Sequence, residues 1–330
     1  YFRVFKYATK SPRGIIQFSH TAPLSRTFAL YFSKMKYFRA YPWMMQLLLF
    51  FMMIITMMGC GSFLVIKFLP VLTNYTAVQI ETINEHSPSA LVNAAIIVQG
   101  LLSVFIFMVP AWVFSYLATP RPAAYIGLRA PGKKIQLLLA ITLMLGIMPV
   151  LQLIEGLISQ INFSPAIKAQ QAASESMMNA FLTMPSFGAF VKTFIIVAIV
   201  PAVGEEFFFR GVLLRFARKP SRNMVGPVIF TAVVFSLTHA NIYGYLSIFI
   251  AGVVLAMIYY FTGSLWCSIL AHLFFNGSQV VLSYMSTNNA SVKAFLSNTS
   301  VPFWYVAAGL AVFVGSYYLL LKNKTPLPDD

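Results

Sequence analysis

Eight long apolar segments dominate the sequence, and each is close to the length at which an α-helix crosses a lipid bilayer. Charged residues make up only 9% of the chain, whereas soluble domains carry roughly 25%. Because backbone polar groups in lipid must be satisfied within their own segment, these runs predict an all-α fold, a polytopic transmembrane helical bundle of about eight spans. Their approximate limits are 44–66, 91–118, 135–158, 188–214, 224–241, 243–262, 264–284 and 302–321.

Basic residues gather between alternate segments and give the chain a formal net charge of +15. They are Arg121, Arg129, Lys133 and Lys134, then Arg215, Arg218, Lys219 and Arg222, and finally Lys322 and Lys324. This alternation is the positive-inside pattern, so we expect both termini in the cytoplasm, the lipid bilayer as a partner and no nucleic acid. The first apolar run, which begins near Trp43, is too long for a signal-peptide core, so we expect no cleavable signal peptide.

Three regions follow from these limits. Residues 1–42 form a basic N-terminal tail with eight Lys and Arg residues, which we expect to lie against anionic lipid on the cytoplasmic side. Residues 43–322 form the integral membrane domain, and residues 323–330 form a C-terminal tail. The outer loop at 159–186 is long and polar. This loop is equally compatible with an amphipathic helix or lid over the site and with a plain connection.

Two adjacent carboxylates and an arginine stand near the end of the fourth segment. Ionisable side chains at membrane depth are costly, and they therefore indicate a functional site. Glu206 and Arg210 are four residues apart on one helical face and predict an ion pair. Glu205 is turned by about 100° from Glu206, so it is free to point into the bundle. We expect one carboxylate to be structural and the other to be chemical.

Two histidines fall in later apolar segments and favour a site shared with Glu205. His239 follows Phe235 by one helical turn, and that ring either forms a wall of the pocket or simply packs. His272 and Asn276 leave one helix face together, a spacing that suits two donors to one oxyanion or an interhelical hydrogen-bonded pair. The helical rise places all three site residues near mid-membrane, with a spread of about 10 Å in depth.

Glu205, His239 and His272 are also a possible zinc ligand set. The sequence contains no H-E-x-x-H motif, so our first expectation is a site without a cofactor, with zinc as the alternative. No G-x-S-x-G motif occurs either, which argues against serine hydrolase chemistry. The chain shows no internal repeat, which weakens a transporter interpretation.

Three motifs in this order resemble the CPBP family of intramembrane endopeptidases, also called the CAAX protease and bacteriocin-processing (Abi) family. They are Glu205-Glu206-xxx-Arg210, Phe235-xxx-His239 and His272-xxx-Asn276. The resemblance covers residues 188–284, which we therefore expect to be the catalytic core. Type II CAAX prenyl endopeptidases belong to the same family, whose members are often labelled metalloproteases.

The resemblance implies an intramembrane endopeptidase that cuts a membrane-delivered peptide or protein. Glu205 would be the general base that activates water, and His239 would orient that water. His272 and Asn276 would hold the oxyanion, while Glu206, Arg210 and Phe235 would support them. We expect an integral, multi-pass protein of the bacterial plasma membrane. A zinc-dependent protease using the same residues and a non-catalytic membrane scaffold with this fold remain the alternatives.

Overall fold

The computed structural model describes residues 37–221, 223–239, 241–297, 301–325 and 327, and within these ranges every regular element is helical. Most of the expected N-terminal tail 1–42 and the end of the C-terminal tail 323–330 lie outside the described residues. The elements are η1 (Phe38–Ala40), α2 (Trp43–Thr73), α3 (Ala77–Glu81), α4 (Ser89–Ser103), η2 (Val104–Met108), α5 (Val109–Ala118), α6 (Pro122–Tyr125), α7 (Ile135–Ser159), α8 (Pro165–Leu182), α9 (Phe187–Thr193), η3 (Phe194–Ile199), α10 (Val200–Glu206), η4 (Phe207–Leu213), α11 (Leu214–Arg218), α12 (Val225–Leu237), α13 (Tyr245–Thr262), α14 (Leu265–Asn288), α15 (Ala290–Ser297) and α16 (Phe303–Lys322).

The expected polytopic helical bundle is confirmed. Within the described residues, 7 helices are long and apolar enough to cross a membrane, namely α2, α4–α5, α7, α9–α11, α13, α14 and α16. The segment expected at 224–241 differs, because α12 has only 13 residues, fewer than the roughly 17 that a span needs. It ends early because side chains of Thr238 and His239 hydrogen-bond the Phe235 carbonyl and compete with the helical ladder.

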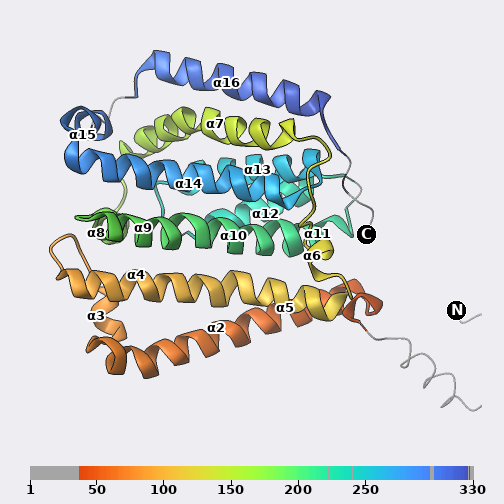
Figure 1. Ribbon diagram of the computed structural model, residues 1–330, viewed down its shortest axis with the longest axis horizontal. Helices are drawn as coiled ribbons and strands as arrows, with labels where there is room; N and C mark the ends of the chain where they lie inside the picture. Colours follow the sequence, from red (N-terminus) through yellow and green to blue (C-terminus); the bar gives the residue numbers. More distant parts are fainter. Residues whose placement is uncertain (1–36, 222, 240, 298–300, 326, 328–330) are drawn as a thin grey trace, which may run out of the picture.

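The long helices run side by side, and the continuous helix α9–α11 lies in the middle of them (Figure 1). On one side of it lie α4–α5 and α2, and on the other lie α14, α7 and α16. Helix α14 packs against both α10 and α7, while α12 packs against α13 as a hairpin. The segment expected to carry the catalytic core therefore occupies the centre of the bundle.

An aromatic cluster holds the central helix against its neighbours. Phe50 of α2 and Phe114 of α5 are fully buried and meet at 5.3 Å between ring centroids. Phe208 lies 5.3 Å from Phe50. Phe209, also fully buried, meets Phe235 of α12 edge-on at 5.0 Å. Large buried rings dominate the packing energy of a core, so this cluster sets the distance between α10 and α12, which carry site residues.

In the part of the chain that the structure describes, three stretches of π-helix interrupt the long helices. Two of them, η2 and η3, end two residues before Pro110 and Pro201. Proline has no N–H and its ring collides with the carbonyl four residues back, and a wider turn relieves both problems. The third, η4, follows Glu205 and Glu206 directly and has no proline. Such wide turns often occur at functional sites.

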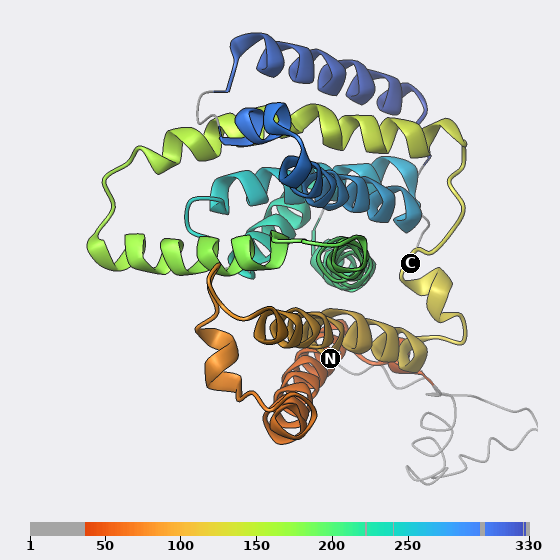
Figure 2. The same ribbon diagram turned by 60° about the vertical axis from the view of Figure 1, so that its left-hand side comes forward.

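The polar loop at 159–186 contains a helix, α8, of 18 residues. Pro165 occupies its first turn, and the Ser164 side chain accepts a hydrogen bond from the Ile167 N–H, the usual start of a helix. Helix α8 lies crosswise to α9–α11, which is seen nearly end-on in Figure 2. Of the two expectations for this loop, the helix is present, and its action as a lid stays a prediction.

Candidate active site

Three helices bring Glu205, His239 and His272 together inside the bundle. Glu205 is in α10, His239 follows the end of α12, and His272 is in α14. The Oε2 atom of Glu205 lies 3.8 Å from Nε2 of His239 and 3.9 Å from Nε2 of His272. The side chains of Glu205 and His272 are buried, whereas that of His239 is 31% exposed. The site therefore opens on the His239 side.

Glu206 makes a different set of contacts from its neighbour. The expected pair with Arg210 is present, because Nη1 donates to Glu206 Oε1 at 2.7 Å and both side chains are buried. His272 Nδ1 lies 3.0 Å from the same oxygen. The Ser268 hydroxyl donates to Oε2 at 2.6 Å. One buried carboxylate thus accepts three hydrogen bonds, of which those from Ser268 and His272 tie α10 to α14, and all its partners favour its charged form.

Arg210 also ties the central helix to α13. Its Nη2 donates to the Gly252 carbonyl at 2.9 Å, and its guanidinium lies over the Phe235 ring at 4.8 Å from the centroid. A Cβ atom on Gly252 would stand 3.1 Å from the Phe235 ring and 3.2 Å from the Ala232 Cα. Glycine therefore permits the close approach of α12 and α13 that brings this carbonyl within reach of Arg210.

Phe235 packs in the core and also forms a wall of the site. Its side chain is only 3% exposed. Its ring lies 4.7 Å from the ring of His239 and 6.0 Å from that of His272. Its carbonyl oxygen lies 2.8 Å from His239 Nδ1. Phe235 therefore orients one histidine by a hydrogen bond and packs its apolar ring against both histidines.

The hydrogen bonds of the two imidazoles decide which nitrogens face Glu205. A carbonyl oxygen can only accept, so His239 Nδ1 carries the proton in its contact with Phe235. His272 Nδ1 likewise donates to the Glu206 carboxylate. In a neutral imidazole the Nε2 atom is then an acceptor. Glu205 Oε2 is buried and has no hydrogen-bond partner among the described residues. Three acceptors therefore face one another, an arrangement suited to a water molecule or a cation.

Asn276 lies one helical turn beyond His272 in α14, as the spacing predicts. Its side chain is half-buried, and no hydrogen bond joins its amide to another described residue. Of the interhelical hydrogen bonds that were the alternative for these two residues, His272 therefore forms one with Glu206, and Asn276 forms none with another described residue. The amide stays available as a donor, and its part in an oxyanion site remains a prediction.

The turn that carries His239 is held from the outer side by α8 and by the connection that precedes it. Gln171 of α8 is buried, accepts a hydrogen bond from the Tyr243 N–H at 3.4 Å and donates to Glu175 at 2.9 Å. Phe163 stacks on the Tyr243 ring at 5.3 Å. Sequence reasoning missed Gln171, since a glutamine in a polar loop carries no signal. It also missed Ser268, although its position one turn before His272 is a signal that could have identified it.

Glu205, His239 and His272 are residue types that bind zinc, but the distances between their donor atoms are longer than in a zinc site. One carboxylate and two imidazoles whose Nδ1 atoms are hydrogen-bonded to oxygen are a common zinc set. Ligands at about 2.1 Å in a tetrahedron lie about 3.4 Å apart, and the separations of 3.8 and 3.9 Å in this site are wider. Within the described residues, no group of three or more His, Cys, Asp or Glu side chains has the arrangement of a metal site.

Comparison with known proteins bears on this central segment. Residues 187–278 match the family model described as type II CAAX prenyl endopeptidase Rce1-like. The match runs from the start of α9 into α14 and contains all the candidate site residues. No curated protein and no solved structure matches the chain. The segment that holds the whole candidate site is thus similar to the type II CAAX prenyl endopeptidases.

Proposed function

We propose that the protein is an intramembrane endopeptidase that hydrolyses a peptide bond of a membrane-delivered peptide or protein. The observation that carries the proposal is the meeting of Glu205 Oε2 with the Nε2 atoms of His239 and His272. It occurs inside the segment that matches the CAAX protease family. A carboxylate and two imidazoles around one point are a set that can position a water molecule and accept its proton.

Glu205 is the general base in this proposal. Its buried Oε2 has no other partner among the described residues, so a water molecule between the carboxylate and His239 finds an acceptor on each side. Separations of 3.8 and 3.9 Å exceed a direct hydrogen bond but suit one bridging water. Glu205 removes one proton while His239 holds the oxygen, and the resulting hydroxide attacks the carbonyl carbon.

His272 and Asn276 stabilise the oxyanion that this attack creates. His272 enters this reaction as the imidazolium rather than the neutral imidazole, because Nε2 donates to the oxyanion while Nδ1 donates to Glu206, and it keeps both protons throughout. The Glu206 carboxylate, 3.0 Å from Nδ1, stabilises that charge. When the tetrahedral intermediate collapses, the C–N bond breaks and the proton held by Glu205 passes to the leaving nitrogen. No metal takes part in these steps.

The proposal places the protein in a bacterial plasma membrane with both termini in the cytoplasm, because both ends of the bundle domain contact the basic loops. Lys219 donates to Gln46 at the start of α2, and Lys133 donates to Asn323 just after α16. The substrate reaches the site from the bilayer. The same catalytic groups serve a prenylated substrate and one without a prenyl group. A non-catalytic scaffold with the same fold is the competing function, and it needs no carboxylate at position 205.

Comparison of membrane peptides in cells with the parent protein and with Glu205→Gln tests the proposal. We expect peptides that depend on the parent to disappear in the variant, while the protein keeps its abundance and melting temperature. The matched control is Glu81→Gln, which removes an exposed carboxylate in α3. Cleavage in H₂¹⁸O should place ¹⁸O in the new C-terminal carboxyl group. Identical peptides in parent and variant would favour the scaffold.

A further inference from the structure

A large open cavity lies at the end of the bundle where the basic loops gather. Its volume is about 1040 Å³, at the upper end of the roughly 300–1,000 Å³ that small-molecule sites occupy. Described residues of three distant segments form its walls, namely the end of α11 with the connection to α12, the end of α13, and the residues after α16. A single inorganic ion would fill little of this space, so its size favours a larger guest.

Two basic side chains in the walls have no partner among the described residues. Arg218 is half-buried and Lys324 is exposed. Neither side chain makes an ion pair or a hydrogen bond with another described residue. No Asp or Glu is among the described residues of the walls. A guanidinium and an ammonium group therefore face one space, and a phosphate group accepts charge-assisted hydrogen bonds from both kinds of donor.

Apolar and aromatic side chains line the same cavity. They are Met224, Tyr260, Phe261 and Leu327. Tyr260 is exposed, and tyrosine is favoured at the boundary between lipid and water because its ring is apolar and its hydroxyl is polar. A purely polar anion would leave these side chains in contact with water. An amphiphilic guest covers both the basic and the apolar parts of the walls.

An exposed apolar helix face begins next to the cavity. Met224, in the wall, is followed directly by α12. Val225, Ile229 and Val233 of this helix are all exposed, and their spacing of four residues places them on one face. In a membrane protein such a face contacts acyl chains, which are as apolar as these side chains. Chains attached to a guest in the cavity would therefore find an apolar surface beside it.

We propose that this cavity binds the headgroup of an anionic phospholipid from the membrane leaflet at this end of the bundle. The phosphate lies between Arg218 and Lys324, and the acyl chains run along the exposed face of α12. Basic pockets between membrane helices are suited to such headgroups. The Thr325 N–H already donates to the Phe261 carbonyl at 2.7 Å. The lipid adds α11 to this connection and so holds the inner end of the helix that carries Glu205.

Thermal unfolding of the purified full chain tests the site independently of any proteolysis. Protein in detergent is titrated with phosphatidylglycerol, and with phosphatidylcholine of the same acyl chains as the control without net charge. We expect phosphatidylglycerol to raise the melting temperature of the parent by about 2–4 °C more than phosphatidylcholine does. Inorganic phosphate at equal ionic strength should not reproduce this rise, because it cannot cover the apolar walls. An equal rise with inorganic phosphate would indicate a site for a free anion and would overturn the proposal.

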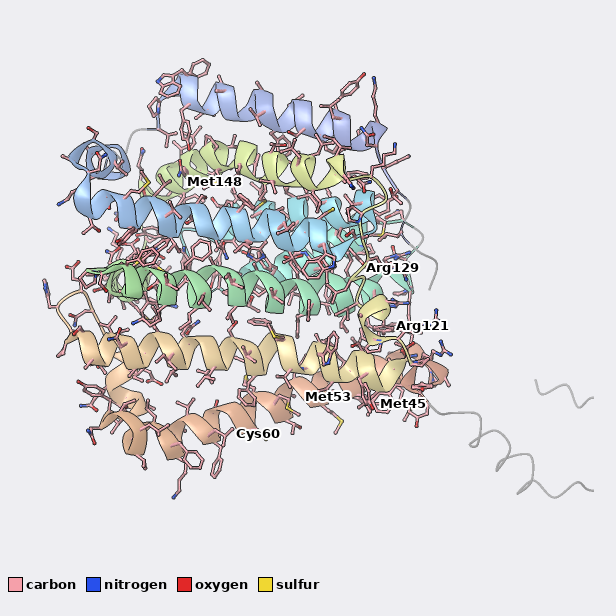
Figure 3. The ribbon with its side chains drawn as sticks, viewed as in Figure 1. Met45, Met53, Cys60, Arg121, Arg129 and Met148 are labelled. Carbon is pink, nitrogen blue, oxygen red and sulfur yellow. The ribbon has the colours of Figure 1, made fainter. Side chains whose placement is uncertain are left out.

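Four single variants test whether the residues of the walls are responsible for the rise. Arg218→Gln and Lys324→Gln should each lose at least half of it. Arg121→Gln and Lys134→Gln are the matched controls, because both cations are exposed and neither lines the cavity. Arg121 lies at the same end of the bundle (Figure 3). Equal losses in all four variants would mean that anionic lipid is attracted to the whole basic surface, and the specific site would be excluded.

Photolabelling of the parent gives a second readout that does not depend on a variant. The probe is a phosphatidylglycerol with a photoreactive group close to its headgroup, and the labelled peptides are identified by mass spectrometry. We expect labels at the start of α12 and at the end of α13, where Met224 and Tyr260 line the cavity. Labels on other helices with none in these two segments would refute the lipid site.

Discussion

Glu206 Oε1 lies 3.0 Å from Nδ1 of His272, so the carboxylate that pairs with Arg210 also holds a histidine of the candidate site. The two residues are on different helices, α10 and α14. The buried Glu206 side chain therefore both stabilises the fold and positions a histidine of the candidate site. A change at Glu206 should alter both stability and the orientation of His272, and the two effects can be measured separately.

Breaking the buried pair should destabilise the protein. Glu206→Gln leaves the Arg210 charge without its partner, and Arg210→Leu leaves the Glu206 charge. Removing one member of a buried pair costs about 3–5 kcal/mol, so both variants should melt at lower temperature in detergent. The exposed variant Glu81→Gln serves as the control. If both variants have the same melting temperature as the parent, this pair does not brace the helix.

Asn276→Ala should leave the fold intact and lower the turnover number by about 10²–10³, the usual loss for one oxyanion donor. His272→Ala should act on the same step, so the double variant should lose less than the product of the two single losses. Gln279→Ala is the matched control, because this exposed amide lies one turn further along α14. An unchanged rate in Asn276→Ala would exclude it from the mechanism.

Exhaustive chelation should leave proteolysis unchanged if Glu205 acts as a base on water. The site would have to contract by several tenths of an ångström to bind zinc with normal distances. The measurement is cleavage of a membrane-delivered peptide after chelation, with the metal content determined on the same sample. Activity that is lost on chelation and restored by zinc alone would establish the zinc alternative, with the same three residues as ligands.

Gln171→Leu should lower the turnover number by about 10-fold, because a small displacement of a positioned group has a large effect on rate. The variant removes the acceptor for the Tyr243 N–H and so loosens the turn that carries His239. KM should change little, since Gln171 is expected to contact no substrate. Gln170→Leu, at the exposed neighbouring position of α8, is the control. Equal losses in both variants would indicate a general effect of an apolar substitution in α8.

The helical bundle, the positions of its long spans and the pairing of Glu206 with Arg210 could all be predicted from the order of the residues. These features depend on properties read along one segment. Hydropathy over about 20 residues identifies a span, and a spacing of four residues places two side chains on one helical face. Neither property requires knowledge of what lies beside the helix.

The atoms that meet between helices could not be predicted without the packing of the helices. His272 Nδ1 faces Glu206 rather than Glu205, and the Ser268 hydroxyl donates a hydrogen bond to the same carboxylate. Gln171 of α8 accepts a hydrogen bond from the turn after His239. Each contact depends on the depth and rotation of two separate helices. Depth and rotation are set by close packing, such as that of Phe209 on Phe235, and by π-helical turns such as η4, which shift the register of every residue after them.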